Sequence, residues 1–136
     1  MQNAECRTQN AESRKRRGED LSARLLQYGA RILRAGVALP RTEEGLHVRR
    51  QMLHSGTSAG ANCQEARAAE SRADFLHKMQ IVLKELRETD YWLRLIVASE
   101  LMPEGKLPRL AMESDELIAT VVRSLTTAIG NARHEN

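Results

Sequence analysis

Hydrophobic residues recur at spacings of three and four along most of the chain, which is the pattern of helices that bury one face. The pattern breaks at Leu39-Pro40, because a residue before proline is disfavoured in the helical conformation, and it resumes after Thr42, a good capping residue. It breaks again before Ser71 and in the proline-containing segment 102–108. Four helices are therefore expected, over residues 20–38, 42–69, 71–97 and 108–130. Their short connections predict an all-α, up-down-up-down four-helix bundle.

The helix expected over residues 71–97 has the strongest pattern, because two apolar stripes run side by side along it. One stripe repeats like a coiled-coil seam and comprises Leu76, Met79, Leu83, Leu86, Asp90, Leu93 and Val97. The second stripe comprises Phe75, Val82, Thr89, Trp92 and Ile96. Two adjacent stripes predict contacts with neighbouring helices on two sides, as in a bundle.

Small residues interrupt the second predicted helix between Ser55 and Asn62, and Gly56 and Gly60 lie within this run. A glycine in a helix interior costs up to about 1 kcal/mol relative to alanine, so two glycines need a structural reason. The G-x-x-x-G spacing places both on one helix face, where a neighbouring backbone can approach closely. We therefore expect a close-packing groove here, and we expect it to face the polar helix over 71–97.

Two catalytic motifs match parts of this region but lack the context that their chemistry requires. The same small-residue run spells G-x-S-x-G with Ser58 as the nucleophile, and Asp74 and His77 follow in triad order. A nucleophile of this type requires a preceding strand, whereas Ser58 is expected in mid-helix. The spacing of Glu85 and Glu88 resembles part of a di-iron site, but the chain lacks the two Glu-x-x-His pairs that such sites use. Neither a catalytic set nor a metal site is expected.

Polar residues concentrate where the second and third predicted helices meet. They are Asn62, Glu65, Ser71, Arg72, Asp74, Lys84, Glu85, Glu88 and Asp90. Two interpretations remain open for this set. It forms either a solvated surface, with ion pairs to Arg67, Arg72, Lys84 or Arg87, or a partly buried network that fixes helix register or a subunit interface. The position of Asp90 on the apolar stripe favours the second interpretation.

The basic charge of the chain lies at its N-terminus. The 136 residues carry a net charge of +3, and residues 1–18 hold five basic and two acidic side chains, which leaves 16 of each sign elsewhere. Because this segment is polar and aperiodic, we expect a disordered basic arm over 1–18 and a folded bundle over 19–136. The basic cluster of the arm is Arg14, Lys15, Arg16 and Arg17. It either neutralises nucleic-acid phosphates or belongs to a solvated tail.

Cysteine usage and hydropathy limit the cellular compartments in which the protein is expected. Cys6 and Cys63 form no metal-binding or disulfide motif, so reduced thiols are expected. No run of 18 apolar residues is present, and no apolar segment of a secretory signal follows the basic cluster. We therefore expect a soluble, cytoplasmic protein without a membrane partner, a cofactor, a metal or a small-molecule substrate.

Many residues at fixed spacing give the chain a family resemblance. They are the run 55–62, Glu65-Ala66, Ser71, Asp74-Phe75, His77-Lys78, Leu83-Lys84-Glu85, Glu88-Thr89 and Tyr91-Trp92-Leu93. In these residues the chain resembles the four-helix-bundle proteins encoded in 23S rRNA intervening sequences, often labelled S23-type ribosomal proteins. The accessory variability protein of diversity-generating retroelements is a related branch. The resemblance covers about residues 20–130.

The resemblance implies a bundle that assembles into a homopentameric ring and has no established catalytic activity. For the retroelement branch it implies binding to a reverse transcriptase and to nucleic acid. Residues implied to act in helix packing or assembly are Gly56, Ser58, Gly60, Asn62, Glu65, Asp74, Glu85, Glu88 and Trp92.

We therefore expect a non-enzymatic oligomeric scaffold or interaction protein, with itself and with RNA, DNA or a nucleic-acid enzyme as partners. The alternative is direct nucleic-acid binding through the basic cluster of the arm and through exposed arginines, for which the candidates are Arg49, Arg50 and Arg67. The balanced charge of the body weakens this alternative.

Overall fold

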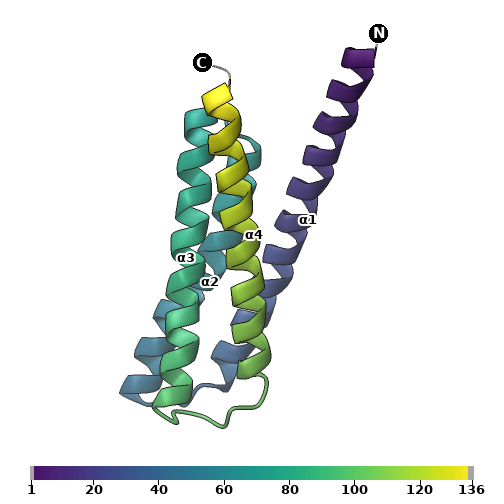
Figure 1. The fold of residues 1–136 in the computed structure, drawn as a ribbon. Helices are drawn as coiled ribbons and strands as arrows, with labels where there is room; N and C mark the ends of the chain where they lie inside the picture. Colours follow the sequence, from purple (N-terminus) through teal and green to yellow (C-terminus); the bar gives the residue numbers. More distant parts are fainter. Residues whose placement is uncertain (1, 135–136) are drawn as a thin grey trace.

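The computed structural model describes residues 2–134, without the side chains of residues 2, 14–17 and 132. This part of the chain contains four helices and no strand: α1 (Gln2–Ala38), α2 (Glu43–Arg67), α3 (Arg72–Ala98) and α4 (Leu107–His134). Successive helices run in opposite directions, and α1 approaches α4 only along its C-terminal half (Figure 1). The prediction of an all-α helical bundle is confirmed.

The first helix differs from the prediction, because α1 begins at Gln2 and the expected disordered arm is helical over residues 2–18. In Figure 1 this N-terminal part projects away from the other helices. Residues 2–17 contain no proline or glycine and many strong helix formers, so a helix nucleated in the bundle extends outward at little cost. Residues 2–18 lack apolar periodicity because this part of α1 is not buried, and not because it is not helical. The division into an arm and a bundle at residue 18 stays a prediction.

The helix starts follow the capping residues that the sequence offers. The hydroxyl of Thr42 accepts a hydrogen bond from the backbone nitrogen of Gly45 at 3.1 Å, and that of Ser71 accepts one from Asp74 at the same distance. Gly45 is also sterically required, because a Cβ there would lie 2.0 Å from the carbonyl oxygen of Pro40. The turn between α1 and α2 therefore depends on both the proline and the glycine.

Buried hydrophobic side chains from all four helices form one core, with Tyr28, Met52, Leu86 and Leu117 among its largest fully buried members. On α3 the buried face comprises Met79, Val82, Leu86, Thr89, Leu93 and Ile96. It draws from both predicted stripes, so these form one broad face, and Asp90 lies half-buried at its border. None of the described helices has a stretch that is long and apolar enough to cross a membrane.

The close-packing groove of α2 faces α1, so the prediction that it faces α3 is wrong. A Cβ on Gly56 would lie 2.7 Å from the Cγ2 atom of Ile32, and one on Gly60 would lie 3.6 Å from the backbone of Leu25. Gly29 of α1 completes the approach, because its Cβ would lie 3.6 Å from the carbonyl oxygen of Gly56. The spacing fixes a face of α2 but does not determine which neighbouring helix covers that face. Of Gly56 and Gly60, only Gly56 lacks the space for a larger side chain.

Candidate functional site

Polar side chains line the outer side of the contact between α2 and α3, and we call this surface the α2–α3 seam. It comprises His47, His54, Ser58, Asn62 and Glu65 of α2 and Lys78, Glu85, Glu88 and Trp92 of α3. Its α2 members follow one another at helical spacings, so they share one face. Because the helices are antiparallel, His47 meets Trp92 at one end, and Glu65 meets Lys78 at the other.

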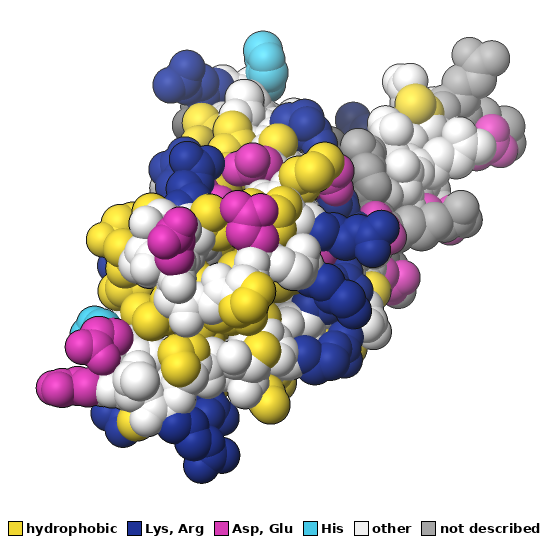
Figure 2. All heavy atoms as spheres, turned by 90° about the horizontal axis from the view of Figure 1, so that it is seen from below, with side chains coloured by type: hydrophobic (Ala, Val, Ile, Leu, Met, Phe, Trp, Pro, Cys, Tyr) yellow, Lys and Arg dark blue, Asp and Glu magenta, His cyan; other side chains and the backbone are white. Residues whose placement is uncertain are grey.

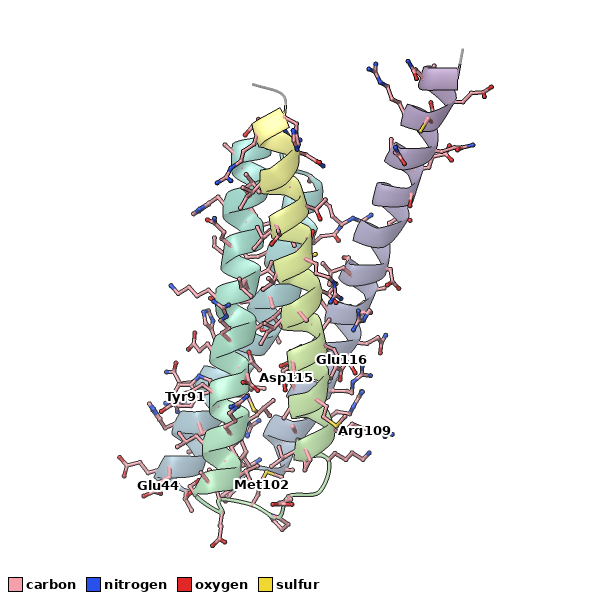
Figure 3. The ribbon with its side chains drawn as sticks, in the orientation of Figure 1. Glu44, Tyr91, Met102, Arg109, Asp115 and Glu116 are labelled. Atoms are coloured by element: carbon pink, nitrogen blue, oxygen red, sulfur yellow. The ribbon has the colours of Figure 1, made fainter. Side chains whose placement is uncertain are left out.

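Aromatic rings cover the end of the seam where α2 begins. The Trp92 ring packs edge-on against the ring of His47 at 5.9 Å and against that of Tyr91 at 5.1 Å. Its Nε1 atom donates a hydrogen bond to Glu88 Oε1 at 3.3 Å. Tyr91 itself points outward from α3 and is 56% exposed (Figure 3). This end of the seam therefore offers partly exposed aromatic rings, nearly perpendicular to one another, beside a carboxylate.

Glu85 lies in the middle of the seam with an unsatisfied carboxylate. Its Oε2 atom is buried and has no hydrogen-bond partner among the described residues. Burial raises the pKa of Glu85, and the nearby Glu88 carboxylate raises it further, against the opposing effect of His54 and Lys84. A buried polar atom without a partner is unfavourable, and the Glu85 side chain as a whole is half-buried, so an external donor that draws its carboxylate outward would be stabilising.

The other end of the seam is held by hydrogen bonds. Asn62 Nδ2 donates to the carbonyl oxygen of Ser58 at 2.9 Å and to its hydroxyl at 3.1 Å. Lys78 Nζ lies 2.7 Å from Glu65 Oε2, and this hydrogen bond raises the pKa of Lys78. The polar groups at this end therefore satisfy one another within the chain.

A buried hydroxyl pair lies beneath the seam and links α2 to α3. Thr89 Oγ1 donates to Ser55 Oγ at 2.8 Å, and both side chains are fully buried. The Ser55 hydroxyl donates to the Met52 carbonyl of its own helix, and the single Thr89 proton is shared between Ser55 Oγ and the Glu85 carbonyl. A satisfied polar pair inside an apolar core favours one register of the two helices over others.

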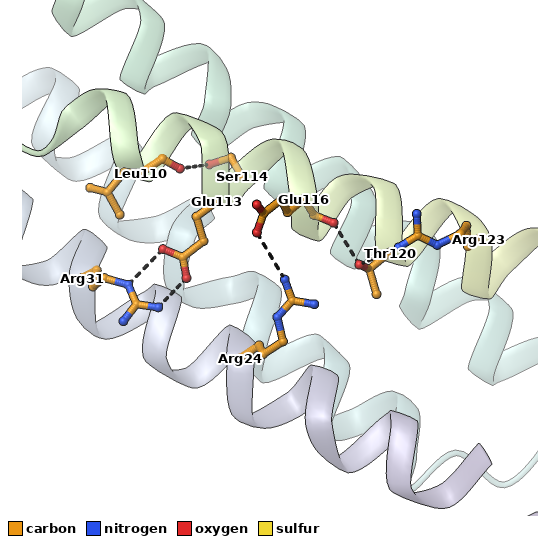
Figure 4. Close-up of polar contacts among 8 residues, drawn as sticks. All are labelled: Arg24, Arg31, Leu110, Glu113, Ser114, Glu116, Thr120 and Arg123. Carbon is orange, nitrogen blue, oxygen red and sulfur yellow. Dashed lines mark hydrogen bonds and ion pairs between the residues drawn. The ribbon is translucent and has the colours of Figure 1, made fainter. Parts of the chain in front are cut away.

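A second charged surface joins α1 to α4, and we call it the α1–α4 seam (Figure 4). It comprises Arg24, Tyr28 and Arg31 of α1 and Glu113, Ser114 and Glu116 of α4. The Arg31 guanidinium binds both Glu113 oxygens, with Nε at 2.9 Å from Oε2, and Arg24 lies 3.9 Å from Glu116. Inside, the Tyr28 hydroxyl bonds that of Ser114 at 2.5 Å. Burial raises the pKa of Tyr28, so its hydroxyl stays protonated.

Asp90 lies on the side of α3 that faces α4 and is only partly satisfied. Its Oδ2 atom pairs with Arg94 Nε at 2.9 Å, while its buried Oδ1 atom has no partner among the described residues. Burial raises the pKa of Asp90, and Asp115 raises it as well, against the opposing effect of Arg94. Asp90 therefore lies outside the α2–α3 seam, although sequence position placed it in the same polar group.

The structure brings together six of the nine predicted packing or assembly residues. Ser58, Asn62, Glu65, Glu85, Glu88 and Trp92 line the α2–α3 seam. Gly56 and Gly60 lie against α1 instead, and Asp74 belongs to the first turn of α3. The set therefore divides into one exposed surface and one internal helix contact. The seam combines partly exposed ion pairs with a partly buried centre, so both interpretations stay predictions.

The candidate nucleic-acid residues do not form one cluster in the described structure. The side chains of Arg14, Lys15, Arg16 and Arg17 lie outside the described residues. Arg49 is half-buried between α2 and α1, Arg50 is exposed, and Arg67 lies near the opposite end of α2, where its guanidinium is 3.7 Å from Glu19. Around the loop end of the bundle, Lys and Arg side chains gather on the side from which α1 projects (Figure 2).

The helical setting of Ser58 disagrees with the geometry of a hydrolase. Ser58 lies within α2, between residues 43 and 67, and its hydroxyl accepts a hydrogen bond from Asn62. A nucleophile elbow instead projects its serine from a strand-to-helix turn. In the described part of the chain, no group of three His, Cys, Asp or Glu side chains is placed to hold a metal ion.

Sequence reasoning missed two features that bear on function. The internal hydroxyl pairs Ser55–Thr89 and Tyr28–Ser114 had a signal, because each member occupies an apolar stripe. The other feature is an exposed apolar row on α1, formed by Leu26 (70% exposed), Leu33 (49%) and Val37 (75%). We call it the α1 stripe. Its spacings of seven and four were visible beside the buried row of the same helix.

The comparisons with known proteins agree with this architecture. The family model of the 23S rRNA-intervening sequence protein matches residues 24–123. A crystal structure of a protein with unknown function from the S23 ribosomal protein family of Bacteroides thetaiotaomicron is similar, at 32% sequence identity and a TM-score of 0.75. The match covers 81% of this chain and 98% of that one. A comparison with curated proteins finds no match. The chain therefore belongs to the 23S rRNA-intervening sequence protein family, the S23 family that its motifs indicate.

Proposed function

We propose that this protein is a non-enzymatic oligomeric scaffold or interaction module, assembled as a homopentameric ring in the cytoplasm. The observation that carries the proposal is the α1 stripe, whose three large apolar side chains face solvent on one side of a helix. Large apolar side chains exposed along one helix face are typical of a protein–protein contact site. The family resemblance supplies the ring size.

Two further observations support the proposal. The polar groups of the α2–α3 seam pair with one another or lack partners, and none is arranged as a nucleophile with its base. Both cysteines of the chain are unpaired, which agrees with a reducing compartment. A scaffold requires only that the helices present these surfaces in a fixed register.

Light scattering on the purified protein tests the assembly. We expect a mass that is a multiple of the 15.3 kDa chain, and the ring proposal requires five chains. The matched pair Val37→Glu and Met112→Glu separates the α1 stripe from other exposed apolar residues, because the two side chains are 75% and 66% exposed. Val37→Glu should reduce the mass while Met112→Glu leaves it unchanged. A monomer at all concentrations would refute the proposal.

Direct nucleic-acid binding is the second candidate, and the basic side chains on the side from which α1 projects favour it (Figure 2). The family description also names 23S rRNA. Replacing all four residues of the basic cluster by glutamine should lower affinity for a nucleic-acid duplex and reduce its logarithmic salt slope by up to about 3.6, since each lost phosphate contact on duplex DNA removes about 0.9. Arg50→Gln, with an intact arm, is the control. An absence of binding at low salt would exclude this function.

A further inference from the structure

We propose that the α2–α3 seam of one copy is the docking surface for the α1 stripe of a second copy, so that copies join head to tail. The inference rests on the proposed function, because it names the two faces through which the assembly forms. It also assigns the unsatisfied Glu85 carboxylate a partner from the second copy.

The α1 stripe has basic side chains beside it. Arg49 of α2 lies against α1, since a Cβ on Gly36 would lie 3.7 Å from its Cγ atom, and Val37 follows Gly36 on the outer side of α1. Arg34 lies next to Leu33 and is exposed. The described residues include no acidic partner for either arginine. This face therefore presents aliphatic side chains together with guanidinium groups that are free to donate.

The α2–α3 seam offers the complementary groups. Its acidic members are Glu65, Glu85 and Glu88. Its one Lys or Arg member, Lys78, already pairs with Glu65, and the neighbouring Lys84 offsets only part of the charge around Glu85. Glu85 has a buried oxygen that lacks a donor, and Trp92 and Tyr91 present rings beside Glu88. A guanidinium binds carboxylates in a bidentate manner and stacks on aromatic rings, so both features suit an arginine from a partner.

The dimensions of the two surfaces are compatible. At about 1.5 Å per helical residue, the α1 stripe from Leu26 to Val37 is about 16 Å long, and the seam from His47 to Glu65 is about 27 Å long. The two surfaces lie on different faces of the bundle, because α1 and α3 do not contact each other in the described chain. Contact between different faces of identical subunits is heterologous, and it generates a ring when the rotation closes.

Mixing two variants tests this arrangement. Val37→Glu damages only the α1 stripe, and Glu85→Lys damages only the seam, so each variant alone should have the mass of one chain, 15.3 kDa. An equimolar mixture should form a dimer and no larger species, since the intact seam of one variant accepts the intact stripe of the other. Met112→Glu, on α4, should retain the wild-type mass. Glu85→Gln, which removes the charge without adding one, should weaken wild-type assembly at least tenfold.

The outcomes separate the two proposals. A monomeric wild-type protein would refute the proposed function itself. An assembled wild type would leave that function standing, while an unchanged mass for Val37→Glu or Glu85→Lys would overturn the head-to-tail contact. A mixture that stays monomeric, with both variants folded by circular dichroism, would overturn it as well. If Glu85→Lys fails to fold, the reduced assembly of Glu85→Gln still tests the seam, and an unchanged affinity would refute its role.

Discussion

The two seams of the bundle differ in whether their carboxylates have hydrogen-bond partners within the chain. On the α1–α4 seam, Glu113 is bound through both oxygens by Arg31 (Figure 4), and the buried hydroxyls of Tyr28 and Ser114 bond each other. On the α2–α3 seam, Glu85 keeps a buried oxygen without a donor, and Glu88 lies close enough to raise its pKa further. The first seam is complete within one chain, whereas the second contains an unfavourable group at its centre.

This difference indicates separate roles for the two surfaces. The helices α1 and α4 have few contacts with each other, and an open groove lined by Arg109 and Met112 runs between them, so their ion pairs hold a loosely packed edge. The helices α2 and α3 pack against each other far more extensively than α1 and α4 do, so core packing carries most of their cohesion. Charged groups on such a well-packed pair of helices can bind a partner. Binding surfaces often include groups that lower the stability of the free chain.

The largest expected effect comes from breaking the inner part of the α1–α4 seam. Tyr28→Ala removes a fully buried ring and should destabilise the bundle by about 3–5 kcal/mol. Tyr28→Phe removes only the hydroxyl, and Ser114 keeps its bond to the Leu110 carbonyl, so the loss should be about 1 kcal/mol. Denaturant unfolding followed by circular dichroism measures both values. Equal losses for the two variants would show that the hydroxyl pair, and not packing, holds this edge.

Much of the fold, and part of the α2–α3 seam, could be predicted from the sequence. The apolar periodicity located α2, α3, α4 and the C-terminal half of α1, and helical spacing alone places Ser58, Asn62 and Glu65 on one face of α2. Spacing did not reveal that Gly56 packs on Ile32 of α1, because a motif on one helix does not specify its neighbour. It also did not reveal the unpaired oxygen of Glu85, since that depends on side-chain positions from two helices. The α1 stripe was readable in principle but was hidden by the stronger buried row beside it.

Neutralising one carboxylate on each seam should change stability in opposite directions. Glu113→Gln removes the acceptor of a charge-assisted pair and should destabilise the bundle by about 1–2 kcal/mol. Glu85→Gln removes a poorly solvated charge and should stabilise it by about 1 kcal/mol. Both are measured in the Val37→Glu background, because assembly makes unfolding depend on concentration. Destabilisation by Glu85→Gln would mean that the chain satisfies this carboxylate by itself.

The pH dependence of stability should also distinguish the two seams, with a smaller effect than the Glu113 and Glu85 substitutions. Burial raises the pKa of folded Glu85 above its unfolded value, so the folded state binds a proton more readily. Stability should therefore fall as the pH rises from the unfolded pKa through the folded pKa, and it should recover as the pH is lowered through the same window. Asp90, whose pKa is also raised, contributes in the same direction.

Thermal unfolding of Val37→Glu across this window, compared with the same chain carrying Glu85→Gln, isolates the Glu85 contribution. The difference between the two midpoints should shrink as the pH is lowered, by the equivalent of less than about 1 kcal/mol. Both chains keep His54, Lys84 and Glu88, the three neighbours that influence the pKa of Glu85. A difference that is constant with pH would show that Glu85 is solvated as well as any surface carboxylate.

The smallest effect concerns the aromatic end of the α2–α3 seam. Glu88→Gln keeps an acceptor for Trp92 Nε1 and should change stability by less than about 0.5 kcal/mol, because the pair is only partly buried. Trp92 is the single tryptophan of the chain, so its fluorescence reports this site alone. Removing the adjacent charge should shift its emission in the Val37→Glu monomer. In the wild-type assembly the same substitution should shift the emission less, because an arginine from the second copy already offsets the carboxylate. Equal shifts in both backgrounds would place Trp92 outside the contact and confine the docking surface to the region around Glu85.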